Sequence, residues 1–323
     1  MNRRLLCGVD LGGTSAKVVL ANQEGELVSS HSFSTQNEGT PEAVLPQLVD
    51  SIQEMLAPLD ATGIGGLGMG VPGLVDVESG TTRFLPNLPT QWRGVEVGKR
   101  LREALRCPVR LMNDVRTATL GELRFGCGRD EPRVTFAFFS LGTGIGGGVV
   151  IDGKVRLGAL GAAGELGHQT VAPDGPRCGC GNRGCLETLA SGPAITAAGV
   201  RLMRSGLAPK LRTLTGGNAD LVTPAQMALA ANDDALVAEA IDDAARWIGL
   251  AAANVVVILH PDRIVLGGGV AEMGSRLTVP VKEEITRRVG MFPTDEVRVE
   301  CSTLGDRAGL MGAIALAIEA SED

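Results

Sequence analysis

The stretch Leu5-Leu-Cys-Gly-Val-Asp-Leu-Gly-Gly-Thr14 decides the fold, because it leads an apolar run into a glycine turn. A second apolar run at residues 16–20 follows at once, and Gly25 separates it from residues 27–28. Short apolar runs bounded by glycine turns are typical of β-strands. The beginning of the sequence therefore predicts three strands joined by two turns.

The same plan returns in the middle of the chain. Residues 134–139 lead into Ser140-Leu-Gly-Thr-Gly144, and a further apolar run at 148–151 follows. Asp152-Gly153 then separates this run from residues 154–155, and Asp-Gly between apolar runs is a good hairpin signal. Such an internal repeat predicts two related lobes. The alternative is that two glycine hairpins are alike by chance.

Helices are predicted between the strands. Thr40-Pro41 and Thr223-Pro224 each suit a helix start, because proline is favoured at the first helical position. Residues 234–259 carry an apolar stripe at helical spacing, and the proline at 261 ends that stretch. A short strand at 263–266 and a last helix at 306–319 complete the pattern. Helices alternating with strands indicate an α/β fold.

Composition and charge exclude several classes of protein. The chain has 37 acidic and 30 basic residues and a net charge of -7, which argues against a nucleic-acid-binding surface. The apolar run at 248–259 is shorter than the roughly 18–20 residues of a membrane-spanning helix. Asp10 interrupts the run at residues 5–9, so no signal peptide is expected. These features predict a cytoplasmic protein that acts on a small molecule and binds neither nucleic acid nor membrane.

Three glycine turns are candidate phosphate sites: Gly12-Gly13-Thr14, Gly142-Thr143-Gly144 and Gly267-Gly268-Gly269. Glycine lets backbone N–H groups approach anionic oxygens, and a threonine hydroxyl adds a donor. Gly147 completes a G-x-G-x-x-G match, but the dinucleotide fingerprint must open a helix, and a hairpin is expected here. The sequence contains no GxxxxGK[ST] motif either. Two strand-turn-strand phosphate turns, one in each lobe, are similar to the actin-like ATPase arrangement; tight turns without a ligand are the alternative.

A cysteine cluster follows a histidine. His168 precedes Cys178, Cys180 and Cys185, and glycines between the cysteines let the chain wrap an ion at short spacing. One imidazole and three thiolates fit a closed tetrahedral zinc site of the structural type. Seven cysteines make a poor disulfide framework, although free thiols or a disulfide remain alternatives.

Carboxylates stand beside the expected ligand positions. Asp114, after Asn113, ends the apolar strand 109–112 and precedes a helix that runs through Phe125. Ligands bind at the carboxyl ends of strands in open α/β sheets, and an aspartate there can accept a hydroxyl proton. The alternative is helix capping, which both residue types favour.

Two further carboxylates flank the cysteine run. Glu165 precedes His168 by three residues, and Glu187 follows Cys185. Folding around an ion would bring both near one place. With the amides of Asn87 and Asn113 they are the acceptors that a polyhydroxylated sugar needs, and ordinary surface carboxylates are the alternative.

Nearly the whole chain resembles a ROK-family sugar kinase, and it is most similar to the bacterial ATP-dependent glucokinases. The motifs that carry the resemblance are Asp10-Leu-Gly-Gly-Thr14 with Lys17, Gly70-Val-Pro-Gly73, Pro86-Asn-Leu-Pro89 with Trp92, Asn113-Asp114, Leu141-Gly-Thr-Gly144, Gly164-Glu-Leu-Gly-His168, Cys178-Gly-Cys-Gly-Asn-Arg-Gly-Cys-Leu-Glu187 and Gly267-Gly-Gly269. The cysteine motif in this order is the specific signal, because each glycine turn alone is common.

The resemblance implies a fold and its domains. It implies a two-lobed actin-like ATPase fold, a duplicated ribonuclease H-like α/β fold with a structural zinc site. The small N-terminal lobe would comprise residues 1–115 and take back the last helix at 305–323. The large lobe, 116–304, would carry the zinc motif and the dimerisation surface of a homodimer.

The resemblance also implies roles for the site residues. Asp114 would be the general base for the sugar 6-hydroxyl. The sugar would be lined by Gly73, Asn87, Asn113, Asp114, Glu165, His168 and Glu187, with His168 also holding zinc beside the three cysteines. ATP would be bound by Asp10, Gly12, Gly13, Thr14, Lys17, Gly142, Thr143, Gly144 and Gly268, and Asp10 would bind Mg²⁺, through water.

Function follows from these roles as an expectation: phosphorylation of a hexose, glucose first, at its 6-hydroxyl by ATP and Mg²⁺. Glu187-Thr-Leu-Ala190 resembles glucokinases, whereas relatives act on N-acetylglucosamine, N-acetylmannosamine, fructose or allose with much the same residues. Sugar-responsive repressors of the family carry a helix-turn-helix domain ahead of the first glycine turn, and Asp10 leaves little chain in front of it here. A catalytically silent sugar sensor is the remaining alternative.

Overall fold

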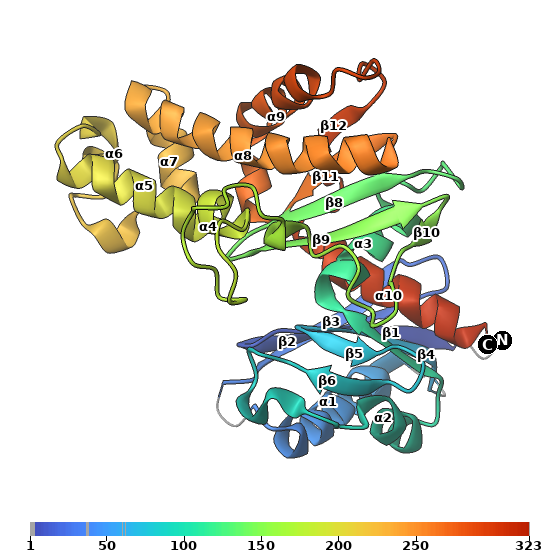
Figure 1. The fold of residues 1–323 in the computed structure, drawn as a ribbon. Helices are drawn as coiled ribbons and strands as arrows, with labels where there is room; N and C mark the ends of the chain where they lie inside the picture. Colours follow the sequence, from blue (N-terminus) through green and yellow to red (C-terminus); the bar gives the residue numbers. More distant parts are fainter. Residues whose placement is uncertain (1–3, 37–38, 60, 62, 323) are drawn as a thin grey trace. The chain divides into compact units, whose positions relative to one another are not determined.

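The chain folds into two compact units in a computed structural model that describes residues 4–36, 39–59, 61 and 63–322. The first unit comprises residues 1–132, 153–163 and 306–323, and the second comprises 133–152 and 164–305 (Figure 1). The last helix therefore returns to the first unit.

A five-stranded sheet in the order β3-β2-β1-β4-β7 is the centre of the first unit. Its strands are β1 (Leu5–Leu11), β2 (Ser15–Ala21), β3 (Leu27–Ser34), β4 (Ile64–Val71) and β7 (Val109–Asn113). The first three strands are antiparallel neighbours, whereas β4 runs parallel to β1 and β7 runs parallel to β4. A small hairpin of β5 (Leu74–Asp76) and β6 (Thr81–Phe84) follows β4.

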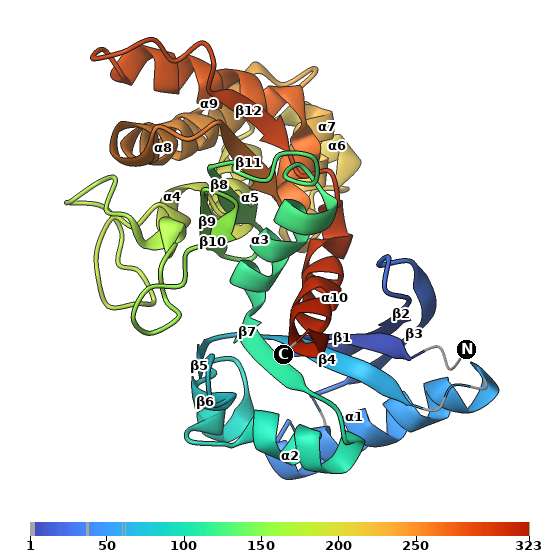
Figure 2. The same cartoon turned by 90° about the vertical axis from the view of Figure 1, so that its right-hand side faces the viewer.

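Helices cover both faces of this sheet, as Figure 2 shows. They are α1 (Pro41–Leu56) and α2 (Val97–Leu105) on one face, and α3 (Asp114–Phe125) and α10 (Ala308–Ser321) on the other. Side chains alternate along β1: Cys7 and Val9 belong to the core beneath α1, whereas Leu6 packs with Ile314 of α10. This period-two alternation is what a strand buried on both faces requires.

The sheet of the second unit repeats that of the first. Its strands are β8 (Phe136–Leu141), β9 (Ile145–Ile151), β11 (Arg263–Gly267) and β12 (Arg298–Cys301), in the order β9-β8-β11-β12. The short strand β10 (Lys154–Val155) falls within residues 153–163, which are counted with the first unit. Antiparallel β8 and β9 correspond to β1 and β2, and parallel β11 and β12 correspond to β4 and β7. The predicted repeat is therefore confirmed as a shared topology.

Six α-helices of the described residues also belong to the second unit. They are α4 (Glu187–Ala190), α5 (Gly192–Arg204), α6 (Pro209–Leu214), α7 (Pro224–Ala230), α8 (Ala235–Leu259) and α9 (Ser275–Arg288). The alanine-rich α8 packs closely on its neighbours, and Ile241, Ile248 and Val256 are fully buried in the core. Helix α8 ends at Leu259, as predicted, because the next residue, His260, precedes a proline and leaves the helical conformation. Among the described residues, no helix is long and apolar enough to cross a membrane.

The division of the chain differs from the one expected at residue 115. Helix α3 belongs wholly to the first unit, and so do residues 126–132 and 153–163. The reason lies in the packing of α3 on α10, where a Cβ on Gly312 would lie 1.7 Å from the carbonyl oxygen of Thr117. Such close contact keeps α3 with the sheet that α10 covers.

Candidate functional site

Asn113 and Asp114 stand where β7 ends and α3 begins, as the sequence predicts. Asn113 is the helix cap: its Oδ1 accepts hydrogen bonds from the backbone N–H groups of Val115 at 3.0 Å and Arg116 at 3.2 Å. Its Nδ2 donates to the carbonyl of Gly73 at 3.2 Å. The carboxylate of Asp114 accepts from the N–H of Val115 at 2.8 Å. The capping alternative therefore holds for Asn113.

The first glycine turn joins β1 to β2. Gly12 donates its N–H to the carbonyl of Ser15 at 2.8 Å, which closes the turn. Gly13 lies against Asn87, since a Cβ at this glycine would be 3.0 Å from the Asn87 carbonyl oxygen. The turn, Thr14 included, and Asn87 are thus brought together within the first unit.

Asp10 lies beside this turn at the end of β1. It pairs in register with Lys17 of β2. Burial raises the pKa of the Asp10 carboxyl, and the Lys17 ammonium opposes that rise. A carboxylate of this kind beside a glycine turn suits a divalent cation that accompanies phosphate.

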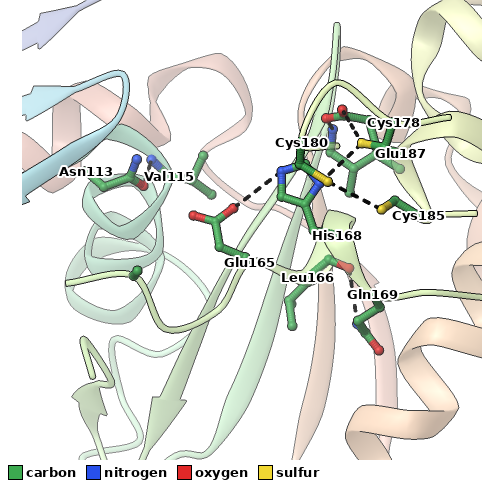
Figure 3. Close-up of polar contacts among 12 residues, drawn as sticks. Asn113, Val115, Glu165, Leu166, His168, Gln169, Cys178, Cys180, Cys185 and Glu187 are labelled. Carbon is green, nitrogen blue, oxygen red and sulfur yellow. Dashed lines mark hydrogen bonds and ion pairs between the residues drawn. The ribbon is translucent and has the colours of Figure 1, made fainter. Parts of the chain in front are cut away.

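His168, Cys178, Cys180 and Cys185 form one cluster (Figure 3). Their ligand atoms all lie within 4.8 Å of one another. Sγ of Cys178 is 3.6 Å from Nδ1 of His168, and Sγ of Cys180 is 3.7 Å from Sγ of Cys185. Zn–S bonds of about 2.3 Å at tetrahedral angles would separate two sulfurs by about 3.8 Å. The four residues fit a tetrahedral metal ion.

Local backbone and charge also favour a cation at the cluster. Gly184 has a φ of +63°, and a Cβ there would lie 1.5 Å from the carbonyl oxygen of Ala172, so only glycine fits this bend. Burial raises the pKa of the Cys185 thiol to about 12 and also raises that of Cys178. The N–H of Asn182 lowers the pKa of Cys180. Three thiols this close lose their protons together only when a metal ion neutralises them.

Glu165 and Glu187 both reach the cluster, as Figure 3 shows. Oε2 of Glu165 is 4.0 Å from Nε2 of His168, the ring nitrogen that faces away from the cysteines. A carboxylate on the second nitrogen of a ligand histidine orients the ring and sets its tautomer. Oε1 of Glu187 is 3.9 Å from Sγ of Cys178. The prediction that folding gathers both carboxylates around the metal site is confirmed.

The second glycine turn joins β8 to β9 in the same unit. Gly142 donates its N–H to the carbonyl of Gly144 at 2.9 Å and accepts from the N–H of Gly192 at 2.9 Å, and Thr143 lies between the two turn glycines. Gly268 has a φ of +81° and packs on the end of β8, where a Cβ would lie 2.4 Å from the carbonyl of Leu141. A strand follows the turn, so its G-x-G-x-x-G match is not a dinucleotide fingerprint.

The predicted residues thus form two groups in each unit. In the first unit, Asp10, Lys17 and Asn87 gather at the first glycine turn, and Asn113 with Asp114 lies against Gly73. In the second unit, Glu165 and Glu187 lie beside the Cys/His cluster, and Gly268 lies at the second glycine turn. Two residues of the site were not predicted from the sequence: Arg116, which donates to Asn113, and Ile145, whose backbone N–H donates to Glu187. A buried arginine and a main-chain donor produce no sequence motif.

A model of the ROK family matches residues 6–320, and this match spans almost the entire chain. The chain belongs to the ROK family. The resemblance that the motifs indicate is therefore confirmed, and so is the two-sheet α/β fold with a Cys/His cluster that could hold a metal ion.

Curated members of the ROK family with similar sequences include both enzymes and regulators. The chain is 32% identical over 321 residues to a glucokinase of Streptomyces coelicolor, with 98% of each chain covered. It is also 32% identical over 317 residues to a xylose repressor of Caldicellulosiruptor bescii, covering 97% of this chain and 78% of that protein.

Among solved structures, a ROK-family glucokinase from Streptomyces griseus in complex with glucose and AMPPNP superposes with a TM-score of 0.81. The two chains are 31% identical, and the match covers 98% of this chain and 99% of that one. Members of the ROK family that are sugar kinases therefore share the fold over its full length.

Proposed function

We propose that this ROK-family protein is a hexose kinase that transfers a phosphoryl group from ATP–Mg²⁺ to the sugar 6-hydroxyl, with glucose as the first candidate. The observation that carries the proposal is the carboxylate of Asp114 at the end of a parallel strand, beside an amide that already caps the helix. A carboxylate at this position can act as the general base.

Phosphoryl transfer needs positioning and charge stabilisation more than covalent chemistry from the protein. Asp114 would accept the proton of the 6-hydroxyl as that oxygen attacks the γ-phosphorus. The sugar would be held by Gly73, Asn87, Asn113, Glu165, His168 and Glu187. These groups offer carboxylate and amide acceptors for neighbouring hydroxyls.

The two glycine turns would hold ATP. Backbone N–H groups at Gly12 and Gly144, with the hydroxyls of Thr14 and Thr143, suit phosphate oxygens. Lys17 would add a positive charge, Asp10 would bind Mg²⁺ through water, and Gly268 would line the adenosine. Mg²⁺, when bound, would neutralise the charge that builds up on the phosphates.

The metal cluster would hold zinc in a structural role. Three cysteines and Nδ1 of His168 fill four positions, so no position remains for water or substrate. Zinc would therefore shape the sugar site through His168 without taking part in the transfer.

The experiment is an ADP-release assay with ATP–Mg²⁺ across free hexoses and N-acetylhexosamines, with Asp114→Asn as the control. Turnover that is strongest on glucose and lost in the control supports the proposal in full. Preference for N-acetylglucosamine, N-acetylmannosamine, fructose or allose would keep the reaction and change the substrate. Absence of turnover with every sugar tested would overturn the proposal.

A sugar-responsive regulator is the second candidate, because a xylose repressor matches over 97% of this chain. Calorimetry distinguishes the two: a sensor binds sugar with no ADP release, whereas a kinase does both. We also propose a homodimer that forms through the second unit, which sedimentation velocity tests directly.

A further inference from the structure

Arg116 is a buried arginine in the first turn of α3 that no motif explains. Only 1% of the surface of Arg116 is exposed to solvent. Nε donates to the carbonyl of Ala163 at 2.9 Å, and Nη2 donates to the carbonyl of Ala162 at 2.9 Å. Nη1 donates to Oδ1 of Asn113 at 3.1 Å. One guanidinium therefore joins the cap of α3 to a separate loop of the first unit.

The bond to Asn113 fixes which way the amide points. Oδ1 accepts from two backbone N–H groups and from Nη1 of Arg116, while Nδ2 donates to the carbonyl of Gly73. An amide reversed by 180° would place its NH₂ group against three donors. Nδ2 carries two protons, so after its bond to Gly73 it can offer the second to a ligand hydroxyl.

The other two bonds fix the chain that leads to Glu165. Ala162 and Ala163 are the last residues of the segment 153–163, which closes on itself through the N–H of Ala163 and the carbonyl of Leu157 at 2.9 Å. Glu165 follows Ala163 by two residues. The guanidinium thus holds the backbone immediately before this carboxylate.

We propose that Arg116 is a positioning residue for the sugar, which sets the amide of Asn113 and the approach of the chain to Glu165. This inference rests on the proposed sugar site and adds a residue that would not itself touch the ligand. It explains why a charge is kept at a buried position, where desolvation is costly unless every donor is matched.

Only arginine satisfies this arrangement. Its guanidinium is planar and presents donors in a fixed fork, whereas lysine offers a compact point charge on a flexible stem. Arg116→Lys would keep the charge and lose the fork. Hydrogen bonds from charged groups contribute about 1.5–3 kcal/mol, so sugar affinity should fall roughly 10- to 100-fold.

The test compares Arg116→Lys and Arg116→Met with Arg124→Met. Arg124 lies on the same helix, but its side chain is 53% exposed and pairs with Glu319. Calorimetry with glucose alone measures sugar affinity without nucleotide, and steady-state kinetics give the separate KM values for glucose and ATP. We expect both Arg116 variants to lose sugar affinity and to raise the glucose KM with the ATP KM unchanged, and Arg124→Met to match the unaltered protein.

A second readout separates positioning from stability. Guanidinium ion at millimolar concentration should restore part of the sugar affinity of Arg116→Ala, whereas urea should not. Equal rises in both KM values, or unchanged sugar affinity, would overturn the proposal. The proposal would also be overturned if Arg116→Lys, Arg116→Met and Arg116→Ala all unfold below the assay temperature, because Arg116 would then serve only the stability of α3.

Failure of the proposed function gives a different result. If the unaltered protein binds a sugar but releases no ADP, the kinase proposal fails, and calorimetry on the same variants still decides the role of Arg116. If the unaltered protein binds none of the hexoses, both proposals fail together.

Discussion

Glu187 accepts a hydrogen bond from the backbone N–H of Ile145, and its Oε2 lies 2.9 Å from that nitrogen. Ile145 is the first residue of β9, directly after the second glycine turn. Glu187 opens α4 two residues after Cys185, and its other oxygen is 3.9 Å from Sγ of Cys178. One carboxylate therefore connects the metal cluster to a turn that we propose binds phosphate.

Removal of the metal should weaken nucleotide binding as well as sugar binding. Without an ion, Cys178 and Cys185 no longer hold α4 in place, and Glu187 loses its fixed position beside Ile145. We expect a chelator, or Cys185→Ser, to raise the dissociation constant for ADP measured by calorimetry without sugar. Added Zn²⁺ should restore affinity after the chelator only.

Cys127→Ser is the matched control, because Cys127 is a half-buried cysteine outside the cluster. It should bind ADP like the unaltered protein. Normal ADP affinity in the metal-free protein would contradict the coupling and leave the metal to act on the sugar side alone.

Asp114→Asn should abolish most turnover while sugar binding survives. The amide keeps the size of the side chain but cannot take the proton of the 6-hydroxyl. A positioned general base contributes about 10²- to 10⁴-fold, so kcat should fall by that factor. Stopped-flow or coupled assays measure kcat, and calorimetry measures the sugar dissociation constant. Near-normal kcat with intact sugar binding would show that another group accepts the proton.

Most strands and helix starts could be predicted from the sequence because they depend on neighbours along the chain. The glycine turn at Gly12 and the helix start at Pro41 are set by local patterns, and so is the cysteine cluster, whose histidine precedes Cys178 by ten residues. Each of these features is read from short-range spacing.

Contacts between distant segments could not be predicted in this way. The division of the chain near α3 depends on glycines that let α3 and α10 approach each other, which no local pattern reveals. The bonds of Arg116 to Ala162 and Ala163 join residues 46 and 47 positions apart. Both features arise from tertiary packing, so a single sequence gives no sign of them.

Gly68 of β4 should be intolerant of any side chain, because α10 lies directly above it. A Cβ there would be 2.1 Å from the carbonyl oxygen of Ala313 and 2.6 Å from the backbone nitrogen of Ala317. Backbone atoms cannot rotate away, so Gly68→Ala should destabilise the first unit by about 1–3 kcal/mol or more. Thermal unfolding followed by circular dichroism measures the change.

Gly65→Ala is the control on the same strand. A Cβ there meets Cβ of Arg4 at 3.4 Å, which is ordinary contact. Its melting temperature should stay close to that of the unaltered protein. Equal melting temperatures for the two variants would mean that α10 moves away at no cost.

Glu284 should stabilise the second unit in a pH-dependent way. Its side chain is 5% exposed on α9 and pairs with Arg287 at 2.7 Å and with Arg288. Burial alone would raise the pKa of Glu284, but hydrogen bonds from Arg288 and Arg287 lower it overall. A carboxyl whose pKa is lower in the folded protein stabilises the fold above its unfolded pKa, about 4.3. That stabilisation is lost as the pH falls through the lower, folded pKa.

Glu284→Gln removes this charge and keeps the shape of the side chain. Because both arginines are partly exposed, the loss at pH 7 should be about 1 kcal/mol. Thermal midpoints of the variant and the unaltered protein should differ by the same amount at pH 7 and pH 5.5, and should converge below about pH 4. Glu283→Gln changes the exposed neighbour and should show no difference at any of these pH values. The prediction is contradicted if the difference between Glu284→Gln and the unaltered protein persists unchanged into acid. The arginines would then not hold this carboxylate ionised, and the variant would act through packing instead. The packing is close at Gly249, where a Cβ would lie 2.5 Å from Cβ of Glu284.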